Sequence, residues 1–140
     1  DALLLFDKVQ ETHQKISVIG RSLGSGVAVY LASKRPLHKM ALITPYDSIK
    51  SLGQKKFIIF PVFLLLKDKY DSLRRVKQIQ TQTIALVAEN DEVIPKKHSL
   101  RLINEFPPEQ ITAITINNSG HNDISYKEEY YQHLKDFFNY

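Results

Sequence analysis

The sequence predicts an α/β fold, in which a parallel β-sheet is flanked by helices. Along most of the 140 residues, short apolar runs of strand length alternate with longer segments of helical periodicity. Strands that alternate with helices are joined by right-handed crossovers, which produce parallel sheets. Because 43% of the residues are hydrophobic, the chain can bury a substantial core. This composition excludes a disordered or fibrous protein.

The first half of the chain contains four predicted elements: a helix at 3–13, a strand at 15–20, a helix at 23–34 and a strand at 39–43. Leu4, Phe6 and Val9 place apolar side chains on one side of the first helix. The run Ile16-Ser17-Val18-Ile19 favours a buried strand, and the apolar run from Val27 to Ala32 favours a buried helix.

The second half repeats this alternation, with a strand at 82–88, a helix at 95–106, a strand at 111–116 and a helix at 125–139. Pro95 suits the first position of a helix, where its missing N–H is no loss. Ser125 and Glu128 have the spacing of a capping box that opens the last helix. The apolar side of that helix is formed by Tyr126, Tyr130, Leu134, Phe137 and Phe138.

A serine lies between glycines where the strand at 15–20 gives way to a helix, in the segment Gly20-Arg21-Ser22-Leu23-Gly24-Ser25-Gly26. This pattern is typical of a nucleophile elbow, a sharp turn that lifts a serine hydroxyl clear of the backbone. Gly20 and Gly24 are expected to let the strand and helix approach closely, since a Cβ would clash there. A glycine-rich turn can also serve packing alone or bind an anion.

Acidic residues and a histidine follow two later strands. Glu89-Asn90-Asp91-Glu92 comes after the strand at 82–88, and Gly120-His121-Asn122 comes after the strand at 111–116. A serine needs a base beside it to become nucleophilic at neutral pH, and elbow-type hydrolases carry serine, acid and histidine in this chain order. His121 is therefore the candidate base. Surface or packing roles are expected for the other histidines, His13, His38, His98 and His133.

These motifs resemble those of the α/β-hydrolase superfamily, and within it serine hydrolases similar to serine aminopeptidases and acyl-protein thioesterases. The resemblance is carried by Gly20 to Gly26, Thr44-Pro45-Tyr46-Asp47-Ser48, Asn90-Asp91-x-x-Ile94-Pro95 and Gly120-His121-Asn122. It implies an α/β-hydrolase-like sheet made of strands 5 to 8 of the family, with a short helical cap insertion. It also implies a catalytic triad in which Ser22 is the nucleophile, His121 the base and Asp91 the acid that orients it. The backbone N–H of Leu23 would be one oxyanion donor, and no cofactor is implied.

Asp91 is favoured as the acid because it stands at the family position, after the strand at 82–88. Asp47 is the alternative, because some members of the superfamily place the acid one strand earlier. Asp47 could instead cap the first helix of the insertion, and Asp123 is expected to terminate its own loop or to cap the last helix. A metal site built from Asp91, His121 and Asp123 is not expected, since paired histidines at ligand spacing are missing. Two roles stay open for Arg21, a bond to a carbonyl or contact with an anionic leaving group.

The resemblance further implies that residues 1–140 are the C-terminal part of one hydrolase domain, with the cap insertion at 47–80. The family's second oxyanion donor comes from a loop upstream of the elbow, but only nineteen residues precede Gly20. We therefore expect the isolated chain to be an impaired enzyme. The strand near Lys15 to Ile19 would also lack a neighbour, and because bare strand edges pair with other chains, we expect self-association there.

The cap insertion is both apolar and basic. Residues 57–66 are ten apolar residues including one proline, fewer than the roughly 20 that a membrane-spanning helix needs. Residues 50–77 carry a net charge of +6, whereas the whole chain carries +4. One interpretation is a cap that selects an acyl or lipid-like substrate at an anionic membrane surface. The other is a buried helix whose lysines face solvent. Nucleic-acid binding is not expected, because no motif for it accompanies the charge.

The expected function is therefore hydrolysis of a carboxylic ester or thioester through an acyl-enzyme formed on Ser22. The alternative is a hydrolase-like fold retained as an inactive binding or assembly module, since a fold does not fix a function. The chain contains no cysteine, which excludes a disulfide framework, a thiolate metal site and a cysteine nucleophile. The sequence does not distinguish an esterase from a thioesterase, lipase or peptidase, and it leaves the localisation open.

Overall fold

The sheet contains four parallel strands in the order in which they occur along the chain. They are β1 (Val18–Arg21), β2 (Lys39–Ile43), β3 (Gln82–Ala88) and β4 (Ile111–Ile116). The structure is a computed structural model that describes residues 2–48 and 71–139. The sheet confirms the α/β class, and its consecutive order is the one implied for strands 5 to 8 of the hydrolase sheet.

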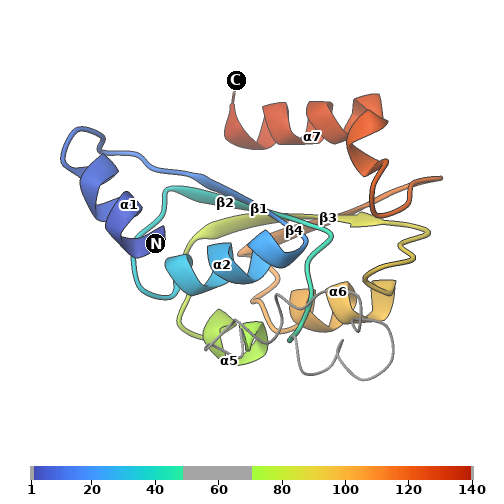
Figure 1. The fold of residues 1–140 in the computed structure, drawn as a ribbon, viewed down its shortest axis with the longest axis horizontal. Helices are drawn as coiled ribbons and strands as arrows, with labels where there is room; N and C mark the ends of the chain where they lie inside the picture. Colours follow the sequence, from blue (N-terminus) through green and yellow to red (C-terminus); the bar gives the residue numbers. More distant parts are fainter. Residues whose placement is uncertain (1, 49–70, 140) are drawn as a thin grey trace.

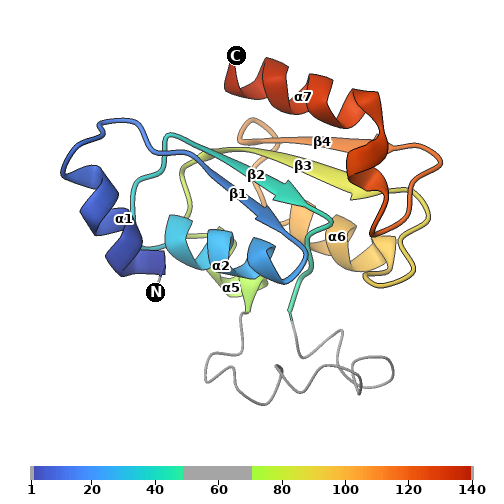
Figure 2. The ribbon, with the colours of Figure 1, turned by 45° about the horizontal axis from the view of Figure 1, so that its top comes forward.

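Helices cover both faces of the sheet. Those described are α1 (Ala2–Gln10), α2 (Leu23–Ala32), α5 (Ser72–Val76), α6 (Lys96–Ile103), a short 3₁₀ helix η2 (Ile124–Tyr126) and α7 (Glu128–Phe138). Figure 1 shows α2, α5 and α6 below the sheet, with α1 beside α2, whereas α7 lies above it. Figure 2 shows the same three layers from another side. None of the described helices is long and apolar enough to span a bilayer.

Alternate side chains of β2 build the two halves of the core. Met40 and Leu42 point to the side of α2, α5 and α6, where they join the cluster that contains Val29 and Leu102. Ala41 and Ile43 point to the other face of the sheet, where they pack with the side chains beneath α7. This two-residue period, with both faces buried, is typical of a parallel sheet between two layers of helices.

The sequence prediction is wrong at several boundaries. The first helix ends at Gln10 rather than at residue 13, and β1 begins at Val18 rather than at residue 15. Pro95 precedes α6 instead of occupying its first helical position. Leu4 is strongly exposed, so it does not belong to the buried side of α1, and Tyr126 is exposed as well.

The predicted capping box at Ser125 is also wrong. Lys127 has an extended backbone (φ −84°, ψ 132°) and separates η2 from α7, so the last helix does not run through from residue 125. Ser125 lies inside η2 and accepts a hydrogen bond from Arg21 instead of capping α7. A capping box is read from two residues three positions apart, whereas Ser125 contacts Arg21, which lies far away in the chain.

Most of the predicted cap insertion lies outside the described residues, including the apolar run at 57–66 and most of the basic segment at 50–77. Within the part that is described, Asp71 caps α5 by accepting a hydrogen bond from the backbone N–H of Arg74 at 3.3 Å. Leu73 and Val76 of that helix pack on the core cluster beneath the sheet. The C-terminal end of the insertion is thus anchored on the same side of the sheet as α2.

Candidate active site

Ser22 occupies a strained turn between β1 and α2. Its backbone has φ 52° and ψ −122°, a conformation that residues with a Cβ rarely adopt and that is concentrated at functional sites. The N–H of Ser22 donates to the carbonyl of Ile43 at 2.9 Å, which fixes the turn to the end of β2. The serine side chain is therefore presented at the carboxyl edge of the sheet.

The two elbow glycines differ in what they contact. A Cβ on Gly20 would lie 2.6 Å from the carbonyl oxygen of Gly24 and 2.7 Å from the Cβ of Ala28, so only glycine fits there. A Cβ on Gly24 would meet nothing within 4 Å. The prediction of a close approach is thus confirmed at Gly20 and wrong at Gly24.

His121 lies between Ser22 and Asp91. Its Nε2 is 2.9 Å from Oγ of Ser22, and its Nδ1 is 2.9 Å from Oδ2 and 3.1 Å from Oδ1 of Asp91. An ionised carboxylate can only accept hydrogen bonds, so Nδ1 of a neutral ring donates to Asp91 and Nε2 accepts from the serine hydroxyl. The side chains of His121 and Asp91 are 8% and 2% exposed.

Asp91 is held by its own turn after β3. Its Oδ1 accepts hydrogen bonds from the backbone N–H groups of Val93 at 2.9 Å and Ile94 at 2.6 Å. Aspartates that bond backbone groups two or three residues onward stabilise such turns. The carboxylate that faces the His121 ring is therefore fixed by the local backbone.

The alternative acid, Asp47, is directed elsewhere. Its Oδ1 lies 3.1 Å from Nδ1 of His98 on α6, and its Oδ2 lies 3.4 Å from a guanidinium nitrogen of Arg101. The backbone N–H of Ser48 also donates to Oδ1 at 2.7 Å. Sequence reasoning gave His98 only a surface or packing role and missed this pair, for which no local signal exists.

Comparison with known proteins agrees with the geometry at the level of family and fold. The family model described as "Serine hydrolase (FSH1)" matches residues 4–122. The chain belongs to this serine hydrolase family.

Curated relatives of this serine hydrolase cover most of the chain. The putative alpha/beta hydrolase L404 of Acanthamoeba polyphaga mimivirus is 30% identical over 112 residues, which are 79% of this chain and 41% of that protein. The alpha/beta hydrolase domain-containing protein aho-3 of Caenorhabditis elegans is 28% identical over 126 residues, which are 89% of this chain and 36% of that protein. The chain thus spans about two fifths of the length of these relatives.

Solved structures show the same fold. MGS-M2, an alpha/beta hydrolase enzyme from a deep-sea metagenome library of the Medee basin, superposes with a TM-score of 0.77 at 15% identity. The match covers 99% of this chain and 70% of that one. A cold-adapted esterase from an Arctic intertidal metagenomic library gives a TM-score of 0.70 at 14% identity, covering 99% of this chain and 51% of that one. The fold of this serine hydrolase is therefore that of the α/β hydrolases.

Two further residues predicted near the site of the serine hydrolase make backbone contacts. A guanidinium nitrogen of Arg21 donates to the carbonyl oxygens of His121 at 2.9 Å and Asn122 at 3.1 Å, the first of the two roles left open for Arg21. Asp123 accepts a hydrogen bond from the N–H of Gly120 at 2.6 Å. Asp123 thus closes its own loop, the first of its two expected roles, whereas the residue that precedes the last helix is Lys127.

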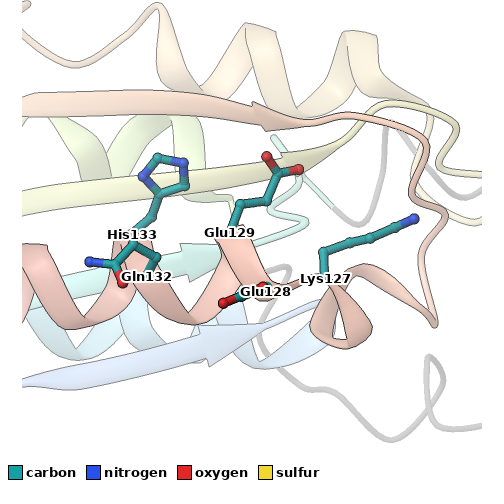
Figure 3. A pocket seen from close by; sticks show the side chains of 5 residues that line it. All are labelled: Lys127, Glu128, Glu129, Gln132 and His133. Carbon is teal, nitrogen blue, oxygen red and sulfur yellow. The ribbon is translucent and has the colours of Figure 1, made fainter.

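A surface pocket of the serine hydrolase lies along α7 and includes no member of the triad (Figure 3). Its lining side chains come from the residue before α7 and from the first turns of that helix, namely Lys127, Glu128, Glu129, Gln132 and His133. Most of these side chains are exposed to solvent and they mix both signs of charge. The strained Ser22 and the buried His121 lie at the carboxyl edge of the sheet, so the candidate active site is there and not in this pocket.

Proposed function

We propose that this chain carries the catalytic triad of a serine hydrolase that cleaves carboxylic esters or thioesters through an acyl-enzyme. The observation that carries the proposal is the continuous line of hydrogen bonds from Ser22 through His121 to Asp91. The two histidine nitrogens contact different partners, and the carboxylate sets the tautomer that leaves Nε2 free to accept a proton. This is the arrangement that activates a serine hydroxyl.

In the first step, Nε2 of His121 takes the hydroxyl proton while Oγ of Ser22 attacks the carbonyl carbon of the substrate. The tetrahedral intermediate then collapses and expels an alcohol or thiol, which receives that proton from His121. In the second step a water attacks the acyl-enzyme with His121 again as base, and the acid product leaves. Asp91 stabilises the imidazolium that forms in each step without becoming protonated.

The backbone N–H of Leu23 is proposed to stabilise the negatively charged oxygen of the intermediate. Leu23 is the first residue of α2, and the first four N–H groups of a helix have no partner within it. The positive end of the helix dipole lies at the same place. A donor of this kind typically contributes about 10²- to 10³-fold to turnover.

The ester class is supported by structural neighbours, which include a cold-adapted esterase and carboxylesterases. A puromycin-hydrolysing peptidase from Mycobacterium tuberculosis shares the fold as well, so amide substrates belong in the same test. The proposal that the substrate is acyl or lipid-like, met through residues 50–77, rests on the sequence of that segment, most of which lies outside the described residues.

The test is covalent labelling with a fluorophosphonate, detected as a mass increase of the intact natural protein that carries this chain. We expect one adduct on the wild type and none on Ser22→Ala. Ser33→Ala is a matched control, because Ser33 lies at the far end of α2 and its hydroxyl donates only to the carbonyl of Tyr30 among the contacts described. An unlabelled wild type that also fails to hydrolyse p-nitrophenyl esters would contradict the proposal and favour an inactive binding module.

A further inference from the structure

The loop that carries His121 has to cross the sheet to reach Ser22. Ser22 follows β1 and His121 follows β4, which are the two outer strands of the described sheet. Neighbouring strands lie about 4.8 Å apart, so these strands are separated by roughly 14 Å. The two side chains are nevertheless 2.9 Å apart. The place of the His121 ring therefore depends on what fixes this loop.

We propose that Arg21 and Glu92 are positioning residues that hold the backbone of His121 from both sides. This inference rests on the proposed function, because it concerns the same triad. Arg21 directly precedes the serine in the sequence, and Glu92 directly follows the aspartate. Each of them bonds a backbone group of the histidine, so the three members of the triad are connected through their sequence neighbours as well as through their side chains.

Arg21 binds the backbone carbonyl group of His121. One guanidinium nitrogen donates to the carbonyl oxygens of His121 and Asn122 at 2.9 and 3.1 Å, and another lies 3.4 Å from Oγ of Ser125. Arginine suits this role because its planar group presents several donors in a fixed geometry, which the single ammonium of lysine does not. Arg21 is also the last residue of β1. The contact therefore joins the strand that leads into Ser22 to the histidine loop.

Glu92 binds the backbone N–H group of His121. Its Oε2 accepts a hydrogen bond from the backbone N–H of His121 at 3.1 Å. A Cβ on Gly120 would lie 2.8 Å from the same oxygen. Gly120 does not have a positive φ, so its backbone conformation does not require glycine. A side chain at position 120 would therefore displace the Glu92 carboxylate from its place beside the His121 backbone.

A second pair of contacts supports the loop one step earlier. Oε2 of Glu89 accepts from the backbone N–H of Asn118 at 2.7 Å, and the N–H of Asn90 donates to the carbonyl of Ser119 at 2.8 Å. The turn after β3 thus carries the loop after β4. Arg21 and Glu92 are distinguished by charge-assisted bonds to His121 itself, which are roughly twice as strong as neutral ones.

The expected consequence is kinetic, because neither residue touches the reacting atoms in this arrangement. A displacement of about 1 Å at a catalytic group can lower the rate by about 10². We expect Glu92→Leu and Arg21→Met each to lower the rate constant of fluorophosphonate labelling by 10- to 100-fold. Because both act on one backbone segment, the double variant should lose less than the product of the two single losses.

Conservative variants separate positioning from a general structural effect. The side-chain oxygen of Glu92→Gln can still accept the His121 N–H, so this variant should keep most of the labelling rate. Arg21→Lys should recover only part of it. The matched controls are Lys34→Met and Glu129→Gln, which change exposed residues away from the triad and should label at the wild-type rate. Thermal unfolding of each variant reports any global loss of structure.

The ¹⁵N chemical shifts of the His121 ring supply a readout that does not require catalysis, since they report which ring nitrogen carries the proton. Glu92→Leu and Arg21→Met should move these shifts, whereas both controls should not. If Ser22 labels and these two variants label and resonate like the wild type, the positioning role is overturned while the triad stands. If the wild type neither labels nor hydrolyses p-nitrophenyl esters, the proposed function fails, and the ring shifts alone decide whether Arg21 and Glu92 hold His121.

Discussion

The carboxylate of Asp47 lies 3.1 Å from Nδ1 of His98 and is fully buried. Asp47 follows β2, whereas His98 belongs to α6, so this pair fastens the end of a central strand to the helix beneath it. A buried carboxylate needs partners because removing a charge from water is costly. Arg101, one turn further along α6, approaches the other oxygen at 3.4 Å. Asp47 and Asp91 thus follow neighbouring strands but contact different histidines.

Replacing each aspartate by asparagine should separate these two roles. We expect Asp91→Asn to lower the fluorophosphonate labelling rate by about 10⁴-fold, because the amide no longer favours the required tautomer of His121. Asp47→Asn should keep the labelling rate within a few-fold but lower the free energy of unfolding by about 1–3 kcal/mol, since its buried donors lose their charged acceptor. Labelling kinetics and urea unfolding measure both quantities. The opposite pattern would make Asp47 the acid.

The two elbow glycines should respond oppositely to alanine. In Gly20→Ala the new methyl group would meet backbone and Cβ atoms closer than 3.0 Å, and overpacking of this kind costs about 1–3 kcal/mol. In Gly24→Ala the methyl group enters open space in the first turn of α2, and alanine at a position whose backbone it can adopt stabilises a protein by about 0.4–1 kcal/mol relative to glycine. Urea unfolding of the two variants checks this. Equal effects would contradict the packing described for the elbow.

Asp7 and Arg35 should contribute stability that depends on pH. The hydrogen bond from the Arg35 guanidinium lowers the pKa of the Asp7 carboxyl below its ordinary value of 3.8. A carboxyl with a lowered pKa stabilises the folded state above its ordinary pKa, and this contribution is lost as the pH falls through the lowered value. The stability difference between wild type and Asp7→Asn should therefore be constant near neutrality and shrink in acid.

The measurement is urea unfolding of both proteins across an acidic pH series. The difference between them should also be smaller at high salt, because the pair is exposed and its attraction is screened. A difference that persists unchanged well below pH 3.8 would show that Asp7 acts through something other than its charge.

The outer edge of β1 predicts self-association. Within residues 2–48 and 71–139, β1 is hydrogen-bonded to β2 alone, and Ile19 in it is 55% exposed. A strand edge of this kind offers unpaired backbone groups to another chain. We expect sedimentation of the 140-residue chain to show a concentration-dependent oligomer that Ile19→Lys shifts towards monomer. Leu100→Lys, on exposed α6 surface, is the matched control. A monomer at all concentrations would contradict this expectation.

Much of the fold could be predicted because buried parallel strands appear as continuous apolar runs. The bounds of β2, β3 and β4 agree with the prediction to the residue. The errors fall where a distant contact overrides a local pattern. Ser125 had the spacing of a helix cap, but it bonds Arg21, which lies 104 residues away in the sequence, and the extended backbone at Lys127 divides the helix.

The candidate triad could be foreseen because each of its members ends a strand, and the carboxyl ends of parallel strands meet at one edge. The surrounding contacts could not. Glu92 bonds a backbone N–H 29 residues away, so no periodicity or spacing reveals it. Gly24 fits the motif, although a Cβ added to it would meet no other atom within 4 Å. Arg21 was a candidate for a carbonyl bond, but which carbonyl depends on how the His121 loop returns over the sheet.

Ser22 and His121 follow the two outer strands of the sheet that the structure describes, so under the proposed function reactivity depends on all four of these strands. No three consecutive strands contain the full triad, because β1 supplies the serine and β4 the histidine, with the aspartate after β3. Under the proposed function, a molecule that has lost either outer strand would keep no activated serine. An active-site label therefore counts completely folded molecules, and its loss during a denaturant titration should follow the cooperative unfolding of all four strands.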